Sequence, residues 1–283
     1  MILVTGASGK TGRAIVAALA KRGERVRAVI HHGGQPIPGD NVEGVVADML
    51  NGDAMHAAMH GVRAVYHICP NVHPQEVAIC AIAIDAAKAA GVRRFVFHSV
   101  LRPQTEKMPH HWRKLRAEEL LQESGLNFTI LQPTAYMQNI LASREHILRE
   151  GVYAVPYPPA TAISLVDLAD VAEVAVRMLT EPNHDYAIYE LCGTPPLSQS
   201  AVATALTEAV GHPVRAQETP LAIWRAAAAQ TLDAARIETL THMFAFYAAF
   251  GLRGNPNVLA WLLGRSPTSL AEFCIREMGV GHG

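Results

Sequence analysis

Three evenly spaced glycines, Gly6, Gly9 and Gly12, have the type and spacing that most directly indicate chemistry. They follow a short apolar run, residues 2–4, and precede a helical pattern of apolar residues that stops at Gly23. In such a turn the first glycine allows a tight bend, the second lets the backbone approach a pyrophosphate, and the third allows close helix packing. Amide groups at the helix start would face the anion. The pattern predicts a dinucleotide-binding turn, and the alternative is a glycine turn with only a packing role.

The end of the second predicted strand, residues 25–31, bears on which dinucleotide binds. An acidic residue there would accept the ribose hydroxyls of NAD, but none occurs before Asp40. His31 and nearby Arg13 leave the position neutral to positive, which favours NADP, with NAD less favoured. His31 and His32 are equally interpretable as solvated loop residues. The predicted cofactor contacts are Gly6, Ser8, Gly9, Lys10, Thr11, Gly12, His31, Asp48, Cys69, Pro70, Lys114 and Pro133.

Asp48 and the pair Cys69-Pro70 follow the third and fourth predicted strands, residues 41–47 and 64–68. The carboxylate of Asp48 would accept a hydrogen bond from the adenine amino group, or would instead cap the next helix or lie in a loop. The Cys69-Pro70 turn would offer backbone groups to the middle of the cofactor. Cys69 itself has no adjacent base, so we expect a small, buried residue rather than a reactive one.

Candidates for the reaction itself follow the fifth predicted strand, residues 93–99. Ser99 ends this strand, and His110 and Lys114 share one face of the next helix because they are four residues apart. A lysine there binds ribose hydroxyls and lowers the pKa of a neighbour by its charge. Ser99 is expected to position the cofactor, because no His/Asp relay accompanies it. The alternatives are a solvated helix lysine for Lys114 and a helix-start residue without function for His110.

The elements that must position these residues alternate between strand and helix through residues 1–132. This alternation predicts an α/β protein with a doubly wound parallel Rossmann sheet as its dinucleotide-binding domain. Beyond Pro133 the alternation thins, which predicts a smaller, mostly helical substrate lobe over residues 133–283, with segments around 162–192 packing back on the sheet. Within this lobe we expect a helix over 136–150 and a proline-rich loop over 151–159.

Composition excludes several classes of protein. The 283 residues are 50% hydrophobic and 17% charged, with a formal net charge of −1, so nothing calls for nucleic acid or an anionic membrane as a partner. We expect neither a signal peptide nor a membrane span. The four cysteines form no CxxC pair and the histidine pairs lack metal-ligand spacing, which favours a cytoplasmic protein without a metal. A monomer and a homodimer are both left open.

With these residues in view, the sequence resembles the atypical, NmrA-like branch of the short-chain dehydrogenase/reductase superfamily. That branch includes quinone oxidoreductases, triphenylmethane dye reductases and isoflavone-reductase-like enzymes. The resemblance is carried by Thr5-Gly6-x-x-Gly9-x-x-Gly12 and by the segments 92–99, 131–139 and 166–172. It implies an NAD(P)H-dependent oxidoreductase that transfers hydride to a flat apolar acceptor such as a quinone or dye.

One departure from the superfamily concerns its Tyr-x-x-x-Lys pair, because His110 stands at the tyrosine position while Lys114 is kept. Alcohol–ketone interconversion is therefore in doubt. Reduction of a conjugated acceptor is less demanding, because the resonance-stabilised product anion can take its proton from His110, Lys114 or water. Tyr136 is a further candidate to replace the phenol. The alternative function is a non-catalytic, NADP-binding redox sensor that acts through a protein partner.

Overall fold

The computed structural model describes residues 1–31, 37 and 39–279. Contacts divide the chain into two units, which interleave in sequence. The first unit contains Met1–Glu106, His110–Gln132 and Val171–Tyr189. The second contains Lys107–Pro109, Pro133–Asp170 and Glu190–Gly283.

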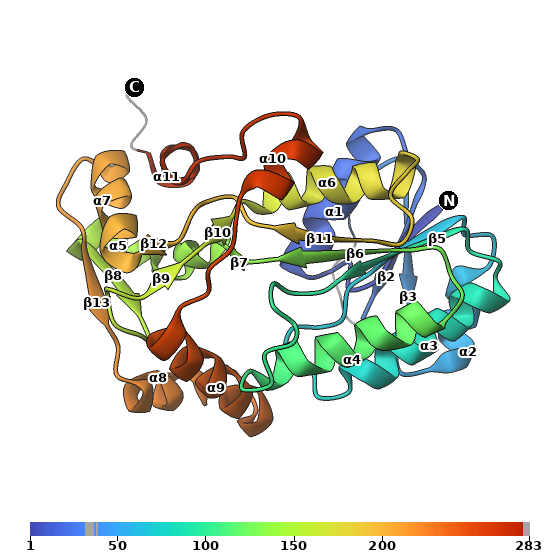
Figure 1. Ribbon diagram of the computed structural model, residues 1–283, viewed down its shortest axis with the longest axis horizontal. Helices are drawn as coiled ribbons and strands as arrows, with labels where there is room; N and C mark the ends of the chain where they lie inside the picture. The colour runs from blue at the N-terminus through green and yellow to red at the C-terminus, as the bar shows by residue number, and fades with distance from the viewer. Residues whose placement is uncertain (32–36, 38, 280–283) are drawn as a thin grey trace. The chain divides into compact units, whose positions relative to one another are not determined.

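Among the described residues, seven strands form one sheet in the order β11-β6-β5-β4-β1-β2-β3 (Figure 1). They are β1 (Ile2–Val4), β2 (Val26–Ile30), β3 (Val42–Val46), β4 (Ala64–His67), β5 (Arg94–His98), β6 (Phe128–Pro133) and β11 (Ala187–Leu191). Leu3 of β1 lies opposite Arg27 of β2 on one side and Val65 of β4 on the other, parallel in both cases. The strand order therefore reverses beside β1, directly before the glycine turn. This arrangement confirms the predicted doubly wound α/β fold.

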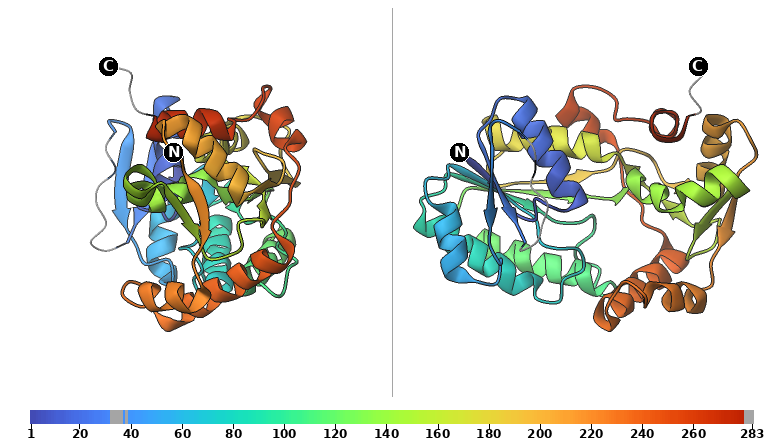
Figure 2. Two further views of the ribbon diagram at one scale, coloured as in Figure 1. Left: turned by 90° about the vertical axis from the view of Figure 1, so that its left-hand side faces the viewer. Right: turned by 180° about the vertical axis from the view of Figure 1, so that it is seen from behind.

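Helices cover both faces of the sheet. The helices are α1 (Lys10–Lys21), α2 (Gly52–Met59), α3 (Glu76–Ala89), α4 (Pro109–Glu123) and α6 (Leu168–Thr180). Helices α2, α3 and α4 lie against one face, and α1 and α6 against the other (Figure 2). The core on the first face joins Leu3, Val65 and Phe95 of the strands to apolar residues of the three helices. The central strands β1 and β4 are buried along their whole length, and such strands show continuous apolar runs in the sequence.

The second unit consists mainly of helices with three short strand pairs. The paired strands are β7 (Ala135–Tyr136) with β10 (Leu165–Val166), β9 (Ala162–Ile163) with β12 (Leu197–Ser198), and β8 (Val152–Val155) with β13 (Arg215–Glu218). Its helices are η1 (Met137–Ser143), α5 (Arg144–Glu150), α7 (Gln199–Val210), α8 (Leu221–Ala228), α9 (Ala234–Phe250), α10 (Asn257–Leu263) and α11 (Leu270–Met278). No helix in the described part of the chain has the length and apolar character needed to cross a bilayer.

Two local predictions for the second unit were wrong. The segment 136–150, expected as one helix, begins with the end of strand β7 and continues as the 3₁₀ helix η1 before α5 starts. The buried residues of η1, Met137 and Ile140, are three apart, which suits the three-residue turn of a 3₁₀ helix. The segment 151–159, expected as a loop, contains β8, which pairs in parallel with the polar strand β13 far along the chain.

Candidate active site

The glycine turn after β1 can be built only with glycine at two of its three positions. Gly6 has φ of +56°, and a Cβ there would lie 2.8 Å from the carbonyl oxygen of Ile68. A Cβ on Gly12 would lie 2.3 Å from the Gly6 oxygen and 2.7 Å from the Ala7 Cα. The Gly9 amide donates to the Gly6 carbonyl over 3.0 Å, which closes the turn. Gly12 thus lets helix α1 start directly against the turn itself.

The start of helix α1 fits an anion. Its N-cap residue is Gly9, which has no side chain with which to cap the helix, and its first turn holds no acidic residue. Backbone amides at such an end carry partial positive charge and are satisfied by a bound phosphate when no side chain does so. Thr11 is buried, Ser8 is half-buried and Lys10 is exposed, and Arg13 Nε donates to the Ser8 carbonyl over 2.9 Å. The residues present therefore fit the pyrophosphate of a dinucleotide.

The ends of β2, β3 and β4 hold the other predicted cofactor contacts. His31 is exposed after β2, and His32 lies outside the described residues. Asp48 is exposed and accepts from the Leu50 amide over 2.9 Å, while Asn51 caps α2, so the alternative that Asp48 caps that helix was wrong. Cys69 is buried, as expected, and burial raises the pKa of its thiol. Pro70, beside it, is half-buried.

Lys114 lies on the buried face of α4 and is held by two oxygen atoms. Its Nζ is 2.6 Å from Glu76 Oε1 of α3 and donates to the His98 carbonyl over 2.7 Å. The same Nζ lies 4.9 Å from the centre of the Phe97 ring, a distance at which a cation is attracted to the ring face. The residue is 7% exposed, so the alternative of a solvated helix lysine was wrong.

Glu118, one turn further along α4, forms the second buried polar contact. It is 3% exposed, accepts from the Ser99 hydroxyl, and accepts from Gln132 Nε2 at 3.0 Å and 3.1 Å through its two oxygens. Burial raises the pKa of Glu118, and the two hydrogen bonds and the charge of Lys114 act against that rise. One helix face therefore binds the ends of β5 and β6, because Ser99 follows β5 and Gln132 lies in β6.

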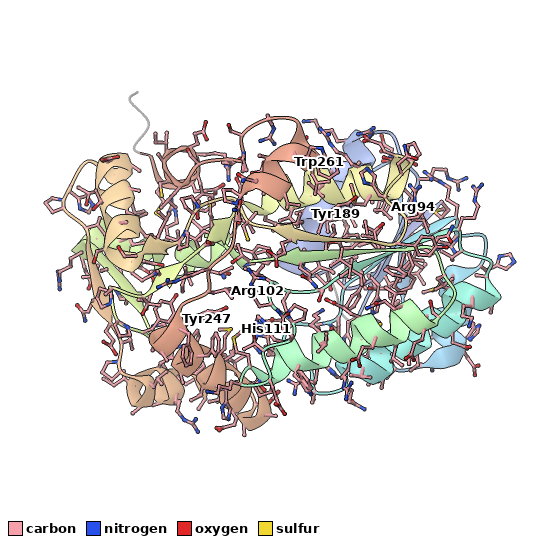
Figure 3. All side chains as sticks on the ribbon, in the orientation of Figure 1. Arg94, Arg102, His111, Tyr189, Tyr247 and Trp261 are labelled. Atoms are coloured by element: carbon pink, nitrogen blue, oxygen red, sulfur yellow. The ribbon has the colours of Figure 1, made fainter. Side chains whose placement is uncertain are left out.

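His110 is buried at 8% exposure beside His111, with the ring centres 4.5 Å apart and the planes perpendicular. Burial, followed by the charges of His111, Arg113 and Lys114, lowers the pKa of His110 to about 2. The ring is therefore neutral near pH 7. His111 Nδ1 lies 3.1 Å from the Arg102 carbonyl oxygen, and Figure 3 labels both residues, Arg102 on the segment before α4 and His111 in the first turn of α4.

Residues 1–274 of the chain match the model of the NmrA-like family. The chain belongs to the NmrA-like family. It is 29% identical to "NAD(P)H azoreductase" of Xenophilus azovorans over 96% of both chains. It is 27% identical to "Quinone oxidoreductase 2" of Escherichia coli K12 over the full length of both.

Solved structures agree with this assignment. The structure of NADPH-dependent quinone oxidoreductase QOR2 from Escherichia coli, complexed with NADPH, superposes with a TM-score of 0.84 at 27% identity, over 98% of this chain and 99% of that chain. NmrA, a negative transcriptional regulator solved in complex with NAD, superposes with a TM-score of 0.80 at 17% identity. The likeness to NmrA extends to the fold alone. The predicted resemblance to the NmrA-like branch is confirmed.

Three residues of this NmrA-like site escaped the sequence prediction: Glu76, Glu118 and Gln132. Glu118 carried a usable signal, because it lies four residues after Lys114 and so on the same helix face. Glu76 and Gln132 carried none, because their contacts depend on how α3 and β6 pack against α4. Of the predicted residues in the second unit, Pro133 is buried at the end of β6 and Tyr136 is half-buried in β7.

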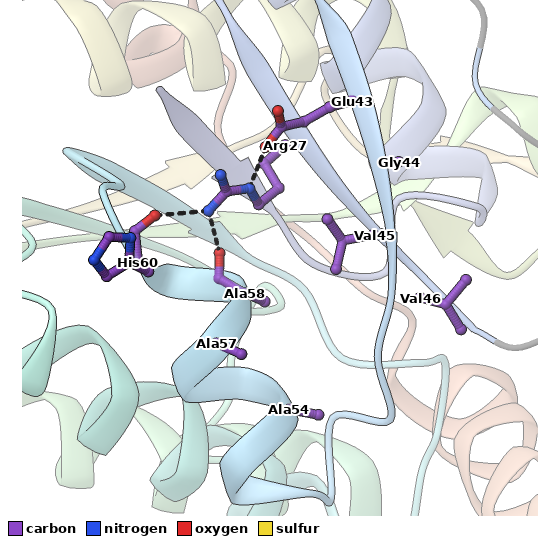
Figure 4. A pocket seen from close by; sticks show the side chains of 9 residues that line it. All are labelled: Arg27, Glu43, Gly44, Val45, Val46, Ala54, Ala57, Ala58 and His60. Carbon is purple, nitrogen blue, oxygen red and sulfur yellow. Dashed lines mark hydrogen bonds and ion pairs between the residues drawn. The ribbon is translucent and has the colours of Figure 1, made fainter.

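An open groove of about 520 Å³ lies elsewhere on the first unit, along the edge strand β3 and helix α2 (Figure 4). Arg27 pairs with Glu43 inside it and donates to the carbonyls of Ala58 and His60, both over 2.7 Å. The described residues that line the groove include none of the predicted site residues. These contacts hold Arg27 against the β3 edge of the sheet and helix α2.

Proposed function

We propose that this NmrA-like protein is an NADP(H)-dependent oxidoreductase that reduces a flat conjugated acceptor, a quinone or a dye. The observation that carries the proposal is the glycine turn, in which Gly6 and Gly12 leave no room for a Cβ and Gly9, at the N-cap of α1, has no side chain to cap the helix. The full-length similarity to an NAD(P)H azoreductase and a quinone oxidoreductase supports the same reaction class.

Different residues of the chain would contact different parts of the cofactor. Amides at the start of α1, with the hydroxyls of Ser8 and Thr11, would hold the pyrophosphate. His31 and Arg13 would tolerate a 2′-phosphate, because no carboxylate follows β2 before Asp40. Lys10, Asp48, Cys69, Pro70, Lys114 and Pro133 complete the proposed contacts. When bound, NADPH supplies the hydride.

A protonated His110 is not available near pH 7 to give a proton to the reduced acceptor. The pKa of His110 is lowered to about 2, so its neutral ring has a single N–H to offer and holds no additional proton near pH 7. Lys114 Nζ is engaged by Glu76 and the His98 carbonyl. The proposal therefore assigns the proton to water or to the phenol of Tyr136. A reduced quinone or dye suits such a site, because its resonance-stabilised anion is protonated without a strong general acid.

The test uses absorbance at 340 nm to follow NADPH and NADH oxidation with a panel of acceptors: menadione, 1,4-benzoquinone, an azo dye and a triphenylmethane dye. We expect turnover with at least one acceptor and a lower KM for NADPH than for NADH. NADPH binding without turnover of any acceptor would contradict the enzyme and support the redox-sensing regulator instead. Absence of binding by both dinucleotides in calorimetry would contradict both functions.

The proposal also places the protein in the cytoplasm, acting on a small-molecule acceptor. Its four cysteines are free and buried, as in a protein that stays in a reducing compartment. Cell fractionation checks this placement, and recovery of the protein in the membrane pellet would contradict it.

A further inference from the structure

We propose that Glu118 is a positioning residue for the nicotinamide half of the cofactor, which it serves by fixing the ends of β5 and β6 through Ser99 and Gln132. The proposal rests on the proposed function, because it assumes that a nicotinamide dinucleotide lies at the carboxyl ends of these strands. Glu118 itself is expected to touch neither cofactor nor acceptor.

The contacts of Glu118 join three separate elements at one point. Ser99 is fully buried and donates its hydroxyl to the carboxylate from the first position after β5. Gln132, 7% exposed, donates from β6 to both carboxylate oxygens. The backbone already links the same strand ends, because the Ser99 amide donates to the Leu131 carbonyl over 2.8 Å. Glu118 therefore adds a link from α4 to two neighbouring strand ends.

The adjacent contacts on α4 act on the same place. Lys114 donates to the carbonyl of His98, the residue before Ser99. His111 contacts the carbonyl of Arg102, three residues after Ser99. The chain from 98 to 102 is thus held at three points by one helix face, and the central point is Glu118.

The sheet order assigns this region to one half of the ligand. Ligands of open α/β sheets bind outside the carboxyl ends of the strands where the order reverses, here between β1 and β4. The β1-β2-β3 side carries the glycine turn and His31, which face the adenosine half. The β4-β5-β6 side is left for the nicotinamide half, and both partners of Glu118 lie there.

A buried carboxylate at this position calls for an explanation beyond packing. An ionised side chain in the interior is expensive, and an apolar residue of similar volume often gives equal or greater stability. The ion pair of Lys114 is formed with Glu76, on a different helix. An apolar residue at position 118 could not accept the hydrogen bonds that Ser99 and Gln132 donate to Glu118.

The experiment measures the affinity of the full-length protein for two probes by calorimetry: NADPH, and adenosine 2′,5′-bisphosphate, which lacks the nicotinamide half. Glu118→Met is expected to weaken NADPH binding about tenfold, the scale of one lost hydrogen bond to a charged group, and to change bisphosphate binding less than about twofold. Glu118→Gln restores an acceptor and is expected to recover most of the NADPH affinity. Glu119→Met is the matched control, because Glu119 is the exposed neighbour on the same helix, paired with Arg116.

Several outcomes would overturn the proposal. Equal weakening of both probes would indicate a general loss of structure, and unchanged affinities with a lowered Tm would indicate a purely structural role. Failure of Glu118→Gln to recover affinity would remove the hydrogen-bond link. If Glu118→Met does not fold, Ser99→Ala tests the same link, with a smaller loss of NADPH affinity expected and unchanged affinity contradicting it. Wild-type protein that binds NADPH but reduces no acceptor would defeat the proposed function while leaving this comparison intact.

Discussion

Replacing Glu76 by glutamine is expected to destabilise the protein by about 3–5 kcal/mol, because it leaves the charge of Lys114 buried without its counter-ion. Glu76 is 1% exposed and Lys114 is 7% exposed, and the two charged atoms are 2.6 Å apart. After the substitution, Lys114 would keep the His98 carbonyl, the face of Phe97 and a neutral amide oxygen at position 76, none of which carries a full negative charge.

The magnitude follows from two opposing terms. At 2.6 Å, with an effective dielectric constant of about 20, the attraction between the two charges is about 6 kcal/mol. Removing each ion from water costs several kcal/mol, so the intact pair contributes little net stability. Once the carboxylate is gone, the desolvation penalty of Lys114 remains without that attraction. At roughly 2–4 °C per kcal/mol for a chain of this size, Tm should fall by roughly 6–20 °C.

The assay is thermal and urea unfolding of the wild type, Glu76→Gln, Lys114→Met and the double variant. Each single variant is expected to be strongly destabilised, and the double variant much less than the sum of the two. Glu145→Gln is the matched control, because Glu145 forms an exposed pair with Arg149 that is worth well under about 1 kcal/mol. A loss below about 1 kcal/mol in Glu76→Gln, or simple additivity in the double variant, would refute this account of the buried pair.

Three further predictions concern cofactor binding, pH and the proton donor. Gly12→Ala should abolish NADPH binding or folding, because its Cβ would lie 2.3 Å from the Gly6 oxygen, whereas Gly52→Ala has open space and should bind normally in calorimetry. Burial lowers the pKa of His67 and His98 to about 3, below the ~6.5 of the unfolded chain, so the stability of the neutral rings is complete above about pH 6.5 and is lost as pH falls. Urea unfolding at pH 5.0 should therefore show about 2 kcal/mol less stability per ring than at pH 7.5, and equal midpoints would contradict the neutral rings. Tyr136→Phe should lower kcat about tenfold or more without changing NADPH affinity if the phenol donates the proton, and an unchanged kcat would assign that step to water.

The central sheet could be predicted from the sequence because its physical causes are local. A strand such as Ile2–Val4, buried on both faces, shows a continuous apolar run, and the glycines that end the helices mark the turns. Strand β8 could not be found this way. Its partner β13 reads Arg-Ala-Gln-Glu, without apolar alternation, and it lies about sixty residues away. Pairing between such segments is set by packing of the second unit rather than by either segment's own pattern.

In the candidate site, too, the features set by the local sequence could be predicted and those set by long-range packing could not. The glycine turn could be predicted from the spacing of its glycines, but the carbonyl of Ile68 that leaves no room for a Cβ on Gly6 appears only in the fold. The burial of Lys114 follows from the face of α4, but its partner Glu76 is set by the packing of α3 against α4. Asp48 shows the limit at shorter range: Asn51 lies only three positions after it, and only the backbone path decides which of the two caps α2.

The replacement of the superfamily's tyrosine by His110 and the burial of Lys114 both concern the proton donor of the reaction. In the superfamily pattern the lysine supports a phenol acid four residues before it, and here that position holds a neutral imidazole whose pKa is lowered to about 2. Lys114 has no phenol four residues before it to support, and in this structure its charge is paired with the carboxylate of Glu76. Neither His110 nor Lys114 then supplies the acid that reduction of an ordinary ketone requires at the alkoxide-forming step. Acceptors whose reduced form spreads its charge over a conjugated system do not need that acid, so the replacement of the tyrosine by His110 argues for the quinone or dye substrate class.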